Sequence, residues 1–280
     1  MSARSRGEIK RVNSRTSHFR TADIPGFSSV AMLVFAALYA PIIVLVIYSF
    51  NASPSVAEWS GFTLDWYVKA AQNDQVVNAT INSLIVATSA AVIATAVATL
   101  AALGTTRRAR YRGITAIYAA INQPLMVPEV VTAVALLVVT AALKKATGYT
   151  GLGYLILAHA AFCIPFAYLP IRARLEGMDL SLETAAADLY ASDWQVFRHV
   201  TLPLLAPGML AGGMLAFVTS LDDVVITEFI KSPGQDTLPT YMLGQLRRAM
   251  TPDVNAISTA LMAVTIVLLF LFFLITRKKS

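Results

Sequence analysis

The stretch Ser181–Gly208, SLETAAADLYASDWQVFRHVTLPLLAPG, is a polar, helix-forming insert between two long apolar runs. Arg172 and Arg174 come just before it, and Arg198 lies within it. A chain that only resided in lipid would have no use for a structured polar insert of this kind. A membrane protein driven by a soluble partner would need one, and the insert therefore favours that class.

Composition points to the same class. The chain has 280 residues, of which 56% are hydrophobic and 14% charged, and its mean hydropathy is +0.63. A soluble domain carries about 25% charged residues. The apolar runs reach the ~20 residues that a bilayer core requires, and the alternating pattern of a membrane β-barrel is absent. The sequence therefore predicts an all-α polytopic membrane protein.

Six transmembrane helices are expected, with the polar insert between the fourth and the fifth. The third is interrupted by Pro124 and Pro128, so we expect it to break near residues 123–128 and to resume at Glu129. The six predicted spans are Val30–Phe50, Asn78–Leu103, Ile114–Leu143, Leu152–Ile171, Pro207–Ile226 and Ile257–Ile275.

The distribution of Lys and Arg predicts the orientation of these spans. With the N-terminus inside, 16 of the 22 basic residues lie on one side. They are six in the tail before residue 21, four in residues 107–112, three at Arg172, Arg174 and Arg198, and three in residues 277–279. Both termini and the insert are therefore expected in the cytoplasm. The net charge of +6 is scattered over separate loops, which argues against nucleic-acid binding.

Local signals predict two short helices in the insert. Ser181 is a candidate cap, with Glu183 near the positive helix end, and Ser192 with Gln195 matches a capping box. We expect Pro203 to end the second helix and Pro207 to begin the next span. Trp194 and Phe197 lie three residues apart and share a face. The pair of helices suits either docking in a groove of a partner or resting on lipid headgroups with Trp194 as an anchor.

The insert resembles the cytoplasmic coupling motif of ABC importer permeases, which reads E-A-A, three residues, G, a spacer and L-P. Two positions depart from that motif, because Thr184 stands at the acidic position, one residue after Glu183, and Tyr190 stands at the glycine. The resemblance implies a coupling helix that docks in a cleft of an ATP-binding subunit. The residues assigned to this contact are Glu183, Thr184, Ala185, Ala186, Asp188, Leu189, Ala191, Ser192, Trp194, Phe197, Leu202 and Pro203.

Residues 220–262 closely resemble the second permease subunit of spermidine/putrescine importers. The matching features include Leu221–Asp223, Leu238–Pro239 and Pro252–Ala256. The resemblance implies a heterodimer with a sister permease, although a homodimer is possible, together with two ATP-binding subunits and a periplasmic solute-binding protein. It also implies a multi-pass protein of the bacterial inner membrane. This chain would bind no cofactor, and ATP and Mg would bind to the partner subunits.

The same comparison suggests a division of the chain. Residues 1–28 form a basic cytoplasmic tail, and residues 29–75 form the first span and an external loop. Residues 76–276 form a type-1 ABC transmembrane core that contains the coupling insert at residues 181–206.

Ionisable groups in or beside membrane spans call for a functional hypothesis. Asp222 and Asp223 lie 15 and 16 residues beyond Pro207, which is ~22–24 Å along a helix and places them in the outer third of the bilayer. They could attract an ammonium group, or they could cap the span or pair with Arg247 or Arg248. Candidate substrate-path residues are Thr219, Asp222, Asp223, Thr227, Glu228, Glu129 and Tyr241.

No pattern in the chain supports enzymatic chemistry. It has no G-x-x-x-x-G-K-[ST] phosphate loop, and its three His residues lack metal-ligand spacing. The single Cys163, inside the fourth span, excludes an intrachain disulfide. Three functions remain open: import of a polyamine, import of a small amino acid such as 4-aminobutyrate or an opine-like solute, and a passive channel or membrane anchor.

Overall fold

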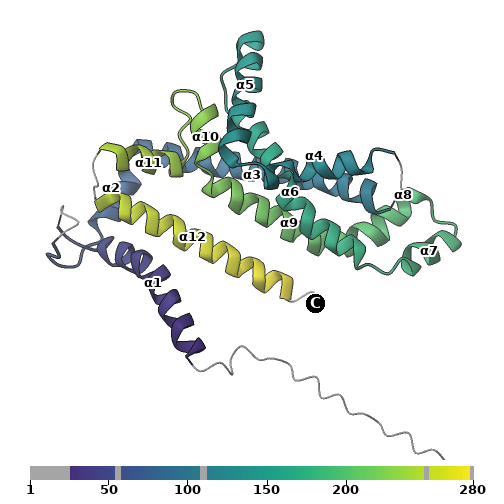
Figure 1. Cartoon of the computed structure of the whole chain (residues 1–280), viewed down its shortest axis with the longest axis horizontal. Helices are drawn as coiled ribbons and strands as arrows, with labels where there is room; N and C mark the ends of the chain where they lie inside the picture. Colours follow the sequence, from purple (N-terminus) through teal and green to yellow (C-terminus); the bar gives the residue numbers. More distant parts are fainter. Residues whose placement is uncertain (1–25, 54–57, 108–111, 249–251, 278–280) are drawn as a thin grey trace, which may run out of the picture. The chain divides into compact units, whose positions relative to one another are not determined.

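The computed structural model describes residues 26–53, 58–107, 112–248 and 252–277 (Figure 1). These residues are nearly all helical, and the only β pairing among them is an isolated bridge between Asn51 and Phe62. The helices are α1 (Phe27–Tyr48), α2 (Asp65–Gln72), α3 (Asp74–Thr106), α4 (Ile114–Met126), α5 (Glu129–Thr147), α6 (Gly153–Glu176), α7 (Ser181–Asp188), α8 (Asp193–Val196), η2 (Phe197–Thr201), α9 (Leu202–Asp222), α10 (Val225–Ile230), α11 (Leu238–Arg248) and α12 (Pro252–Arg277).

The chain divides into two compact units, residues 1–47 and residues 48–280. The first unit contains nearly all of α1, a 22-residue helix with Pro41 in its interior. Most of the predicted basic tail, residues 1–25, lies outside the described residues. All other helices belong to the second unit.

The prediction of six membrane-spanning helices is confirmed. Among the described residues, six helices are long and apolar enough to cross a bilayer. All six differ from the expected spans by a few residues at their ends, and the third and the fifth differ by a larger amount at their starts. The third span is α5 alone, since the chain leaves the helix between Met126 and Glu129 and α4 has only 13 residues. The fifth runs from Asp193 to Asp222 and so includes part of the insert.

The break in the third span follows from its prolines. Val127, the residue before Pro128, is extended, with φ −102° and ψ 140°, because a proline disfavours the helical conformation in the residue before it. Pro128 then stands immediately before the first turn of α5, and Glu129 lies in that turn. The expected break near residues 123–128 is therefore present, at its C-terminal edge.

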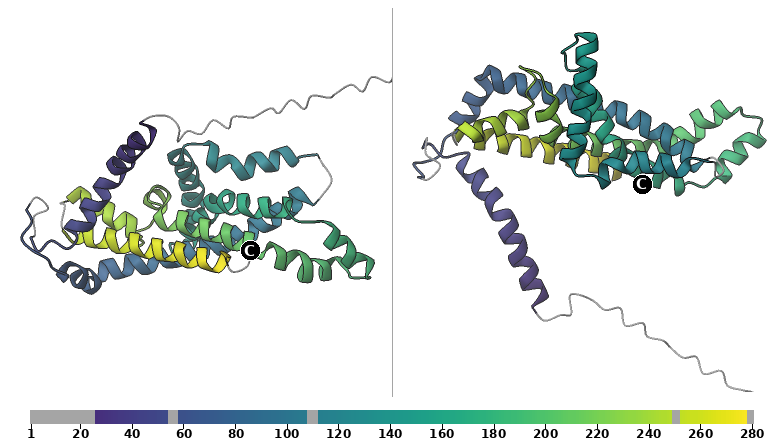
Figure 2. Two further views of the ribbon diagram at one scale, coloured as in Figure 1. Left: turned by 90° about the horizontal axis from the view of Figure 1, so that it is seen from below. Right: turned by 45° about the horizontal axis from the view of Figure 1, so that its top comes forward.

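Helices α3, α6 and α9 pack closely and form the core of the second unit (Figures 1 and 2). Small residues make this approach possible: Ala87, Ala90, Ala94 and Ala98 of α3 are completely buried. A Cβ atom on Gly212 of α9 would lie 2.5 Å from the carbonyl oxygen of Ala167 in α6. Backbones this close are typical of membrane helices, where van der Waals packing replaces hydrophobic burial.

The two regions of functional interest lie at opposite ends of this core. The insert, α7 and α8, lies at one end of the α3–α6–α9 bundle in all three views, and α2 and α11 lie at the other (Figures 1 and 2). Helices α3, α6 and α9 therefore extend from the insert toward the segment that contains Glu228 and Tyr241.

Candidate functional site

The insert folds as two short helices joined by a tight turn. The side chain of Asp179 accepts a hydrogen bond from the Ser181 backbone N–H at 2.9 Å, so Asp179 supplies the capping oxygen that we expected from Ser181. This bond lowers the pKa of the exposed Asp179 carboxyl below its ordinary value. The predicted capping box is present, since Gln195 Oε1 accepts from the Ser192 N–H at 2.8 Å.

The prediction that Pro203 ends the second helix is wrong. Helix α8 continues through the π-helical turn η2 into α9 as one apolar helical segment, Asp193–Asp222, of 30 residues. Pro203 lies in the first turn of α9 and Pro207 inside it. A proline lacks the N–H that would bond to the carbonyl four residues earlier. The turn directly before Pro203 is wider than an α-helical turn, because the Leu202 N–H bonds to the Phe197 carbonyl, five residues earlier.

Glu183 ties the insert to the core. Its Oε1 accepts hydrogen bonds from Arg107 Nη2 at the end of α3 and from Thr201 Oγ1, both at 3.0 Å. The Arg107 and Glu183 side chains are only 21% and 20% exposed, so this ion pair is partly desolvated. These bonds link α7 to the end of α3 and to Thr201, the residue directly before α9.

Most of the predicted coupling residues form an exposed surface. Leu189 and Trp194 are 82% and 65% exposed. Thr184, Ala185, Asp188, Ser192 and Pro203 are also exposed, whereas Glu183, Ala186, Ala191, Phe197 and Leu202 are partly buried. The Trp194 and Phe197 rings lie 5.5 Å apart, which confirms their shared face.

At the other end of the core, Asp222 and Asp223 do not form the adjacent pair that the sequence suggested. Helix α9 ends at Asp222, whose side chain is exposed and lines a cavity of about 240 Å³ with Met242 and Ser258. Asp223 is buried and extended, and its carboxylate accepts from the backbone N–H groups of Ile226 and Thr227. It therefore caps the short helix α10, whereas the sequence had suggested a cap of the span itself or a pair with Arg247 or Arg248.

Asp223 belongs to a buried polar cluster centred on His159 of α6. The two ring nitrogens of His159 lie 2.8 Å from Ser220 Oγ and 2.9 Å from Thr227 Oγ1. His159 Nε2 is also 3.4 Å from Asp223 Oδ2, and both side chains are 1% exposed. These contacts join α6, α9 and α10 at the point where the fifth span breaks. The sequence offered one signal for His159, an ionisable residue in an apolar span, which our selection of candidates omitted.

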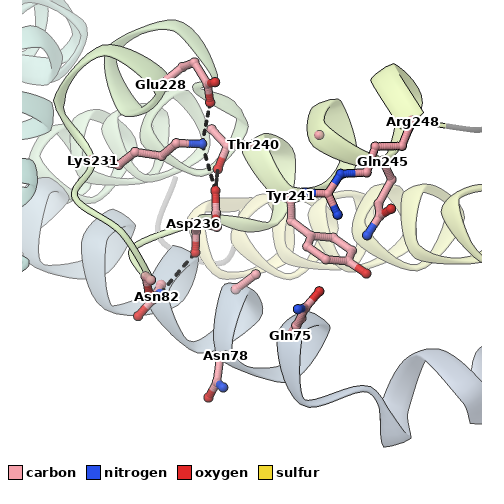
Figure 3. Close-up of a pocket in the computed structure, with 13 residues that line it drawn as sticks. Gln75, Asn78, Asn82, Glu228, Lys231, Asp236, Thr240, Tyr241, Gln245 and Arg248 are labelled. Carbon is pink, nitrogen blue, oxygen red and sulfur yellow. Dashed lines mark hydrogen bonds and ion pairs between the residues drawn. The ribbon is translucent and has the colours of Figure 1, made fainter.

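Glu228 and Tyr241 line a polar cavity of about 500 Å³ between α3, α10 and α11 (Figure 3). In it the Lys231 ammonium group donates to Glu228 and, at 2.8 Å, to Asp236. Burial would lower the pKa of Lys231, but the bonds to Asp236 and Glu228 outweigh it and the pKa is raised. Arg247 is 3.8 Å from Glu228. Lys231 and Asp236 were not anticipated, because only the loop between α10 and α11 brings them together.

The remaining candidates occupy separate positions. Glu129 is exposed at the start of α5 and approaches Asp223. Thr219 is half-buried in α9, and the Tyr241 hydroxyl accepts from Asn73 Nδ2 at 3.4 Å. Of the candidate substrate-path residues, Asp223 and Thr227 belong to the buried cluster and Glu228 and Tyr241 line the polar cavity. Asp222 lines the smaller cavity, and Glu129 and Thr219 line neither cavity. In the described parts of the chain, no three His, Cys, Asp or Glu side chains are arranged to hold a metal.

Comparison with known proteins gives this geometry a context. Residues 115–278 match the family described as binding-protein-dependent transport system inner membrane component. The chain is 38% identical to the putrescine transport system permease protein PotI of Escherichia coli over 90% of this chain and 91% of that protein. It is 37% identical to the spermidine/putrescine transport system permease protein PotC of Haemophilus influenzae, over 89% of this chain and 95% of the relative.

Solved structures share the fold. A bacterial ABC transporter involved in the import of the acidic polysaccharide alginate matches with a TM-score of 0.67 and 18% identity, over 90% of this chain and 96% of that one. The MetNI methionine ABC transporter matches with a TM-score of 0.62 and 16% identity, over 73% of this chain and 95% of its own.

Proposed function

The chain belongs to the family of binding-protein-dependent transport system inner membrane components, and from this premise we propose that it is the permease subunit of an ATP-driven polyamine importer. The observation that carries the substrate class is similarity along nearly the whole chain. The relatives that are 35–38% identical over about nine-tenths of their length are named as putrescine or spermidine/putrescine permeases.

The side chains at the end of α9 that is distant from the insert suit such a cargo. Polyamines are chains of ammonium groups, which carboxylates stabilise by charge-assisted hydrogen bonds. Asp222 is exposed and lines the same cavity as Ser258, and an ionisable group on a membrane span ordinarily faces a functional surface. We assign to Asp222 a direct contact with the cargo, and to Asp223 the positioning of α10 through its cap.

The arrangement of the insert supports ATP-driven coupling. ATP and Mg would bind to two separate ATP-binding subunits, and closure of these subunits would push on residues 183–203. Glu183 passes this movement to Arg107 of α3. The continuous segment Asp193–Asp222, about 45 Å long at 1.5 Å per residue, passes it to the break at Asp223. Alternating access requires two such states, each favoured by a different ligand.

The proposed assembly also contains a sister permease and a periplasmic solute-binding protein, in the bacterial inner membrane. The insert and both termini face the cytoplasm in this arrangement. One structural neighbour is an alginate transporter in complex with an alginate-bound periplasmic protein, which gives a precedent for the fold in such an assembly.

The experiment that tests the substrate is uptake of labelled putrescine and spermidine by cells with and without this chain, in the presence of excess unlabelled 4-aminobutyrate. We expect chain-dependent polyamine uptake that the competitor does not reduce. Uptake that 4-aminobutyrate abolishes, or no chain-dependent polyamine uptake, would move the assignment to an amino-acid-like or opine-like solute.

A second experiment tests the coupling role against a passive channel or an anchor. Ala186→Arg and Leu189→Arg place a bulky charge on the insert, distant from the membrane core. We expect both variants to reach the membrane in normal amounts, to bind the ATP-binding subunit weakly and to lose uptake. Unchanged subunit binding and uptake in both variants would exclude the coupling role.

A further inference from the structure

We propose that Tyr190 is the central anchor of the contact between this chain and its ATP-binding subunit, and that it fits an apolar hollow with a basic rim on that subunit. The inference rests on the proposed coupling function and names the chemistry of the partner surface. Its evidence lies in the backbone, the exposure and the charge of the turn between α7 and α8.

The turn requires a residue in the left-handed conformation. Helix α7 closes with two hydrogen bonds, from the Tyr190 N–H to the Ala187 carbonyl at 2.9 Å and from the Ala191 N–H to the Ala186 carbonyl at 3.2 Å. This pair of bonds is the Schellman motif, in which the residue after the cap takes a positive φ and is usually glycine or asparagine. Tyr190 has φ 63° and is the only described non-glycine residue with a positive φ.

The fold gains nothing from the aromatic ring that could offset this conformation. Tyr190 is 98% exposed, the highest value among the large hydrophobic residues described. Its ring therefore makes almost no contact within the chain. A strained residue persists where something else requires its side chain, and here that requirement must come from outside the described chain.

The neighbours of Tyr190 extend the surface that it presents. Leu189 is 82% exposed and Trp194 65% exposed, and the Gln195 bond to Ser192 fixes the start of α8 beside them. Large aromatic side chains surrounded by a ring of weaker contacts are typical of interface hot spots. A tyrosine offers such a contact at low entropic cost, because only two torsions are immobilised.

Charge distinguishes a protein partner from the membrane surface. Residues 178–197 around the turn contain four acidic residues and no Lys or Arg, and the only Arg of the insert, Arg198, follows them. Glu183 is engaged by Arg107, whereas Asp188 and Asp193 are exposed on either side of the turn. Helices that rest on lipid headgroups are rich in Lys and Arg, and the cytoplasmic leaflet is anionic. The surface around Tyr190 would be repelled by lipid and matches a hollow lined by basic side chains.

The test measures binding of the cognate ATP-binding subunit to the complete permease in nanodiscs. Tyr190→Gly and Tyr190→Asn keep the turn and remove the ring, whereas Tyr190→Phe keeps the ring. We expect Tyr190→Gly and Tyr190→Asn to weaken binding at least about tenfold with no fall in melting temperature, and Tyr190→Phe to bind like the wild type. Equal or tighter binding by Tyr190→Gly would overturn the proposal.

Two further readouts complete the test. The double variant Asp188→Lys/Asp193→Lys should weaken binding, and wild-type affinity should fall with added salt. If the wild-type affinity for the ATP-binding subunit did not change with salt, the basic rim would be overturned. If Tyr190→Gly bound that subunit like the wild type and lost affinity only for phosphatidylglycerol vesicles, the protein partner would be overturned. A wild-type chain that binds no ATP-binding subunit would refute the proposed function itself, whereas wild-type binding that survives Tyr190→Gly refutes only the anchor.

Discussion

Substitution of Glu183 by Gln should release α7 from the core without unfolding the protein. Glu183 Oε1 accepts two hydrogen bonds at 3.0 Å, from Arg107 and from Thr201. Hydrogen bonds to a charged group contribute about 1.5–3 kcal/mol each and neutral ones about 1 kcal/mol. Both ionic side chains are about one-fifth exposed, so solvent screening reduces the difference between the charged and the neutral hydrogen bonds. We expect a loss of about 1–2 kcal/mol from the local stability of α7.

Hydrogen exchange of the peptide that covers residues 181–188 measures this loss. A change of about 1–2 kcal/mol corresponds to exchange faster by about 5–30-fold, if closing is fast relative to exchange. The matched control is Glu176→Gln, which removes an exposed pair with Arg172 within one helix, at 2.8 Å and with side chains 34% and 52% exposed. Pairs of this kind are worth about 0.3–0.5 kcal/mol, so the control should change exchange less than about threefold.

A double-mutant cycle attributes the effect to the ion pair. If the two partners act together, Arg107→Gln should add little to Glu183→Gln. Equal exchange in Glu183→Gln and Glu176→Gln would refute the reasoning, as would full additivity with Arg107→Gln. We also expect Glu183→Gln to lower the uptake per ATP hydrolysed, since the insert then moves independently of α3.

Three further predictions concern the core and the outer region. Gly212→Ala should cost about 1–3 kcal/mol by overpacking, since its Cβ would lie 2.5 Å from the Ala167 carbonyl oxygen. In the control Gly104→Ala, the new Cβ would have nothing within 4 Å, so the change should be neutral or stabilising by up to about 1 kcal/mol. Thermal melting in detergent compares the two variants, and equal melting temperatures would contradict the close packing at Gly212. His159→Leu should cost about 1–3 kcal/mol, because the buried Ser220 hydroxyl loses its partner at 2.8 Å, whereas Thr227 and Asp223 keep their bonds to each other. His159→Gln should recover part of the melting temperature, and a wild-type melting temperature in His159→Leu would argue against the cluster. Lys231→Met should loosen the loop before α11; because the pKa of Lys231 is raised from 10.5, the stabilisation is complete below pH 10.5 and disappears as the pH rises through the raised pKa. Exchange of residues 232–240 in both proteins across that range measures this, and a difference that grew with pH would contradict it.

Features that depend on local chemistry could be predicted from the sequence. The length of the apolar runs gave six spans, because a bilayer sets a minimum helix length. Pro128 predicted the break before Glu129, and the spacing of Ser192 and Gln195 predicted the start of α8. The departure at Tyr190 was visible as a residue type, but its positive φ and its exposure required the folded turn.

Features that depend on which residues meet could not be predicted. Asp222 and Asp223 are neighbours in the chain, yet one is exposed and the other buried, because the helix ends at Asp222 and the extended Asp223 bonds to the start of α10. Pro203 was expected to end a helix, but the helix continues through a π-helical turn into α9.

The sequence by itself determined that this protein spans a membrane, that six apolar segments cross it, and that a polar insert interrupts them. These properties follow from hydropathy, length and local hydrogen bonding, which act within a few turns of a helix. Only the tertiary structure decided that Glu183 pairs with Arg107, that His159 joins Asp223, and that Lys231 bridges Glu228 and Asp236. The partners in the first two pairs are 76 and 64 residues apart in the chain, and Lys231 reaches Asp236 only through the path of a loop. The first two contacts depend on the packing of helices against one another, which no local pattern encodes.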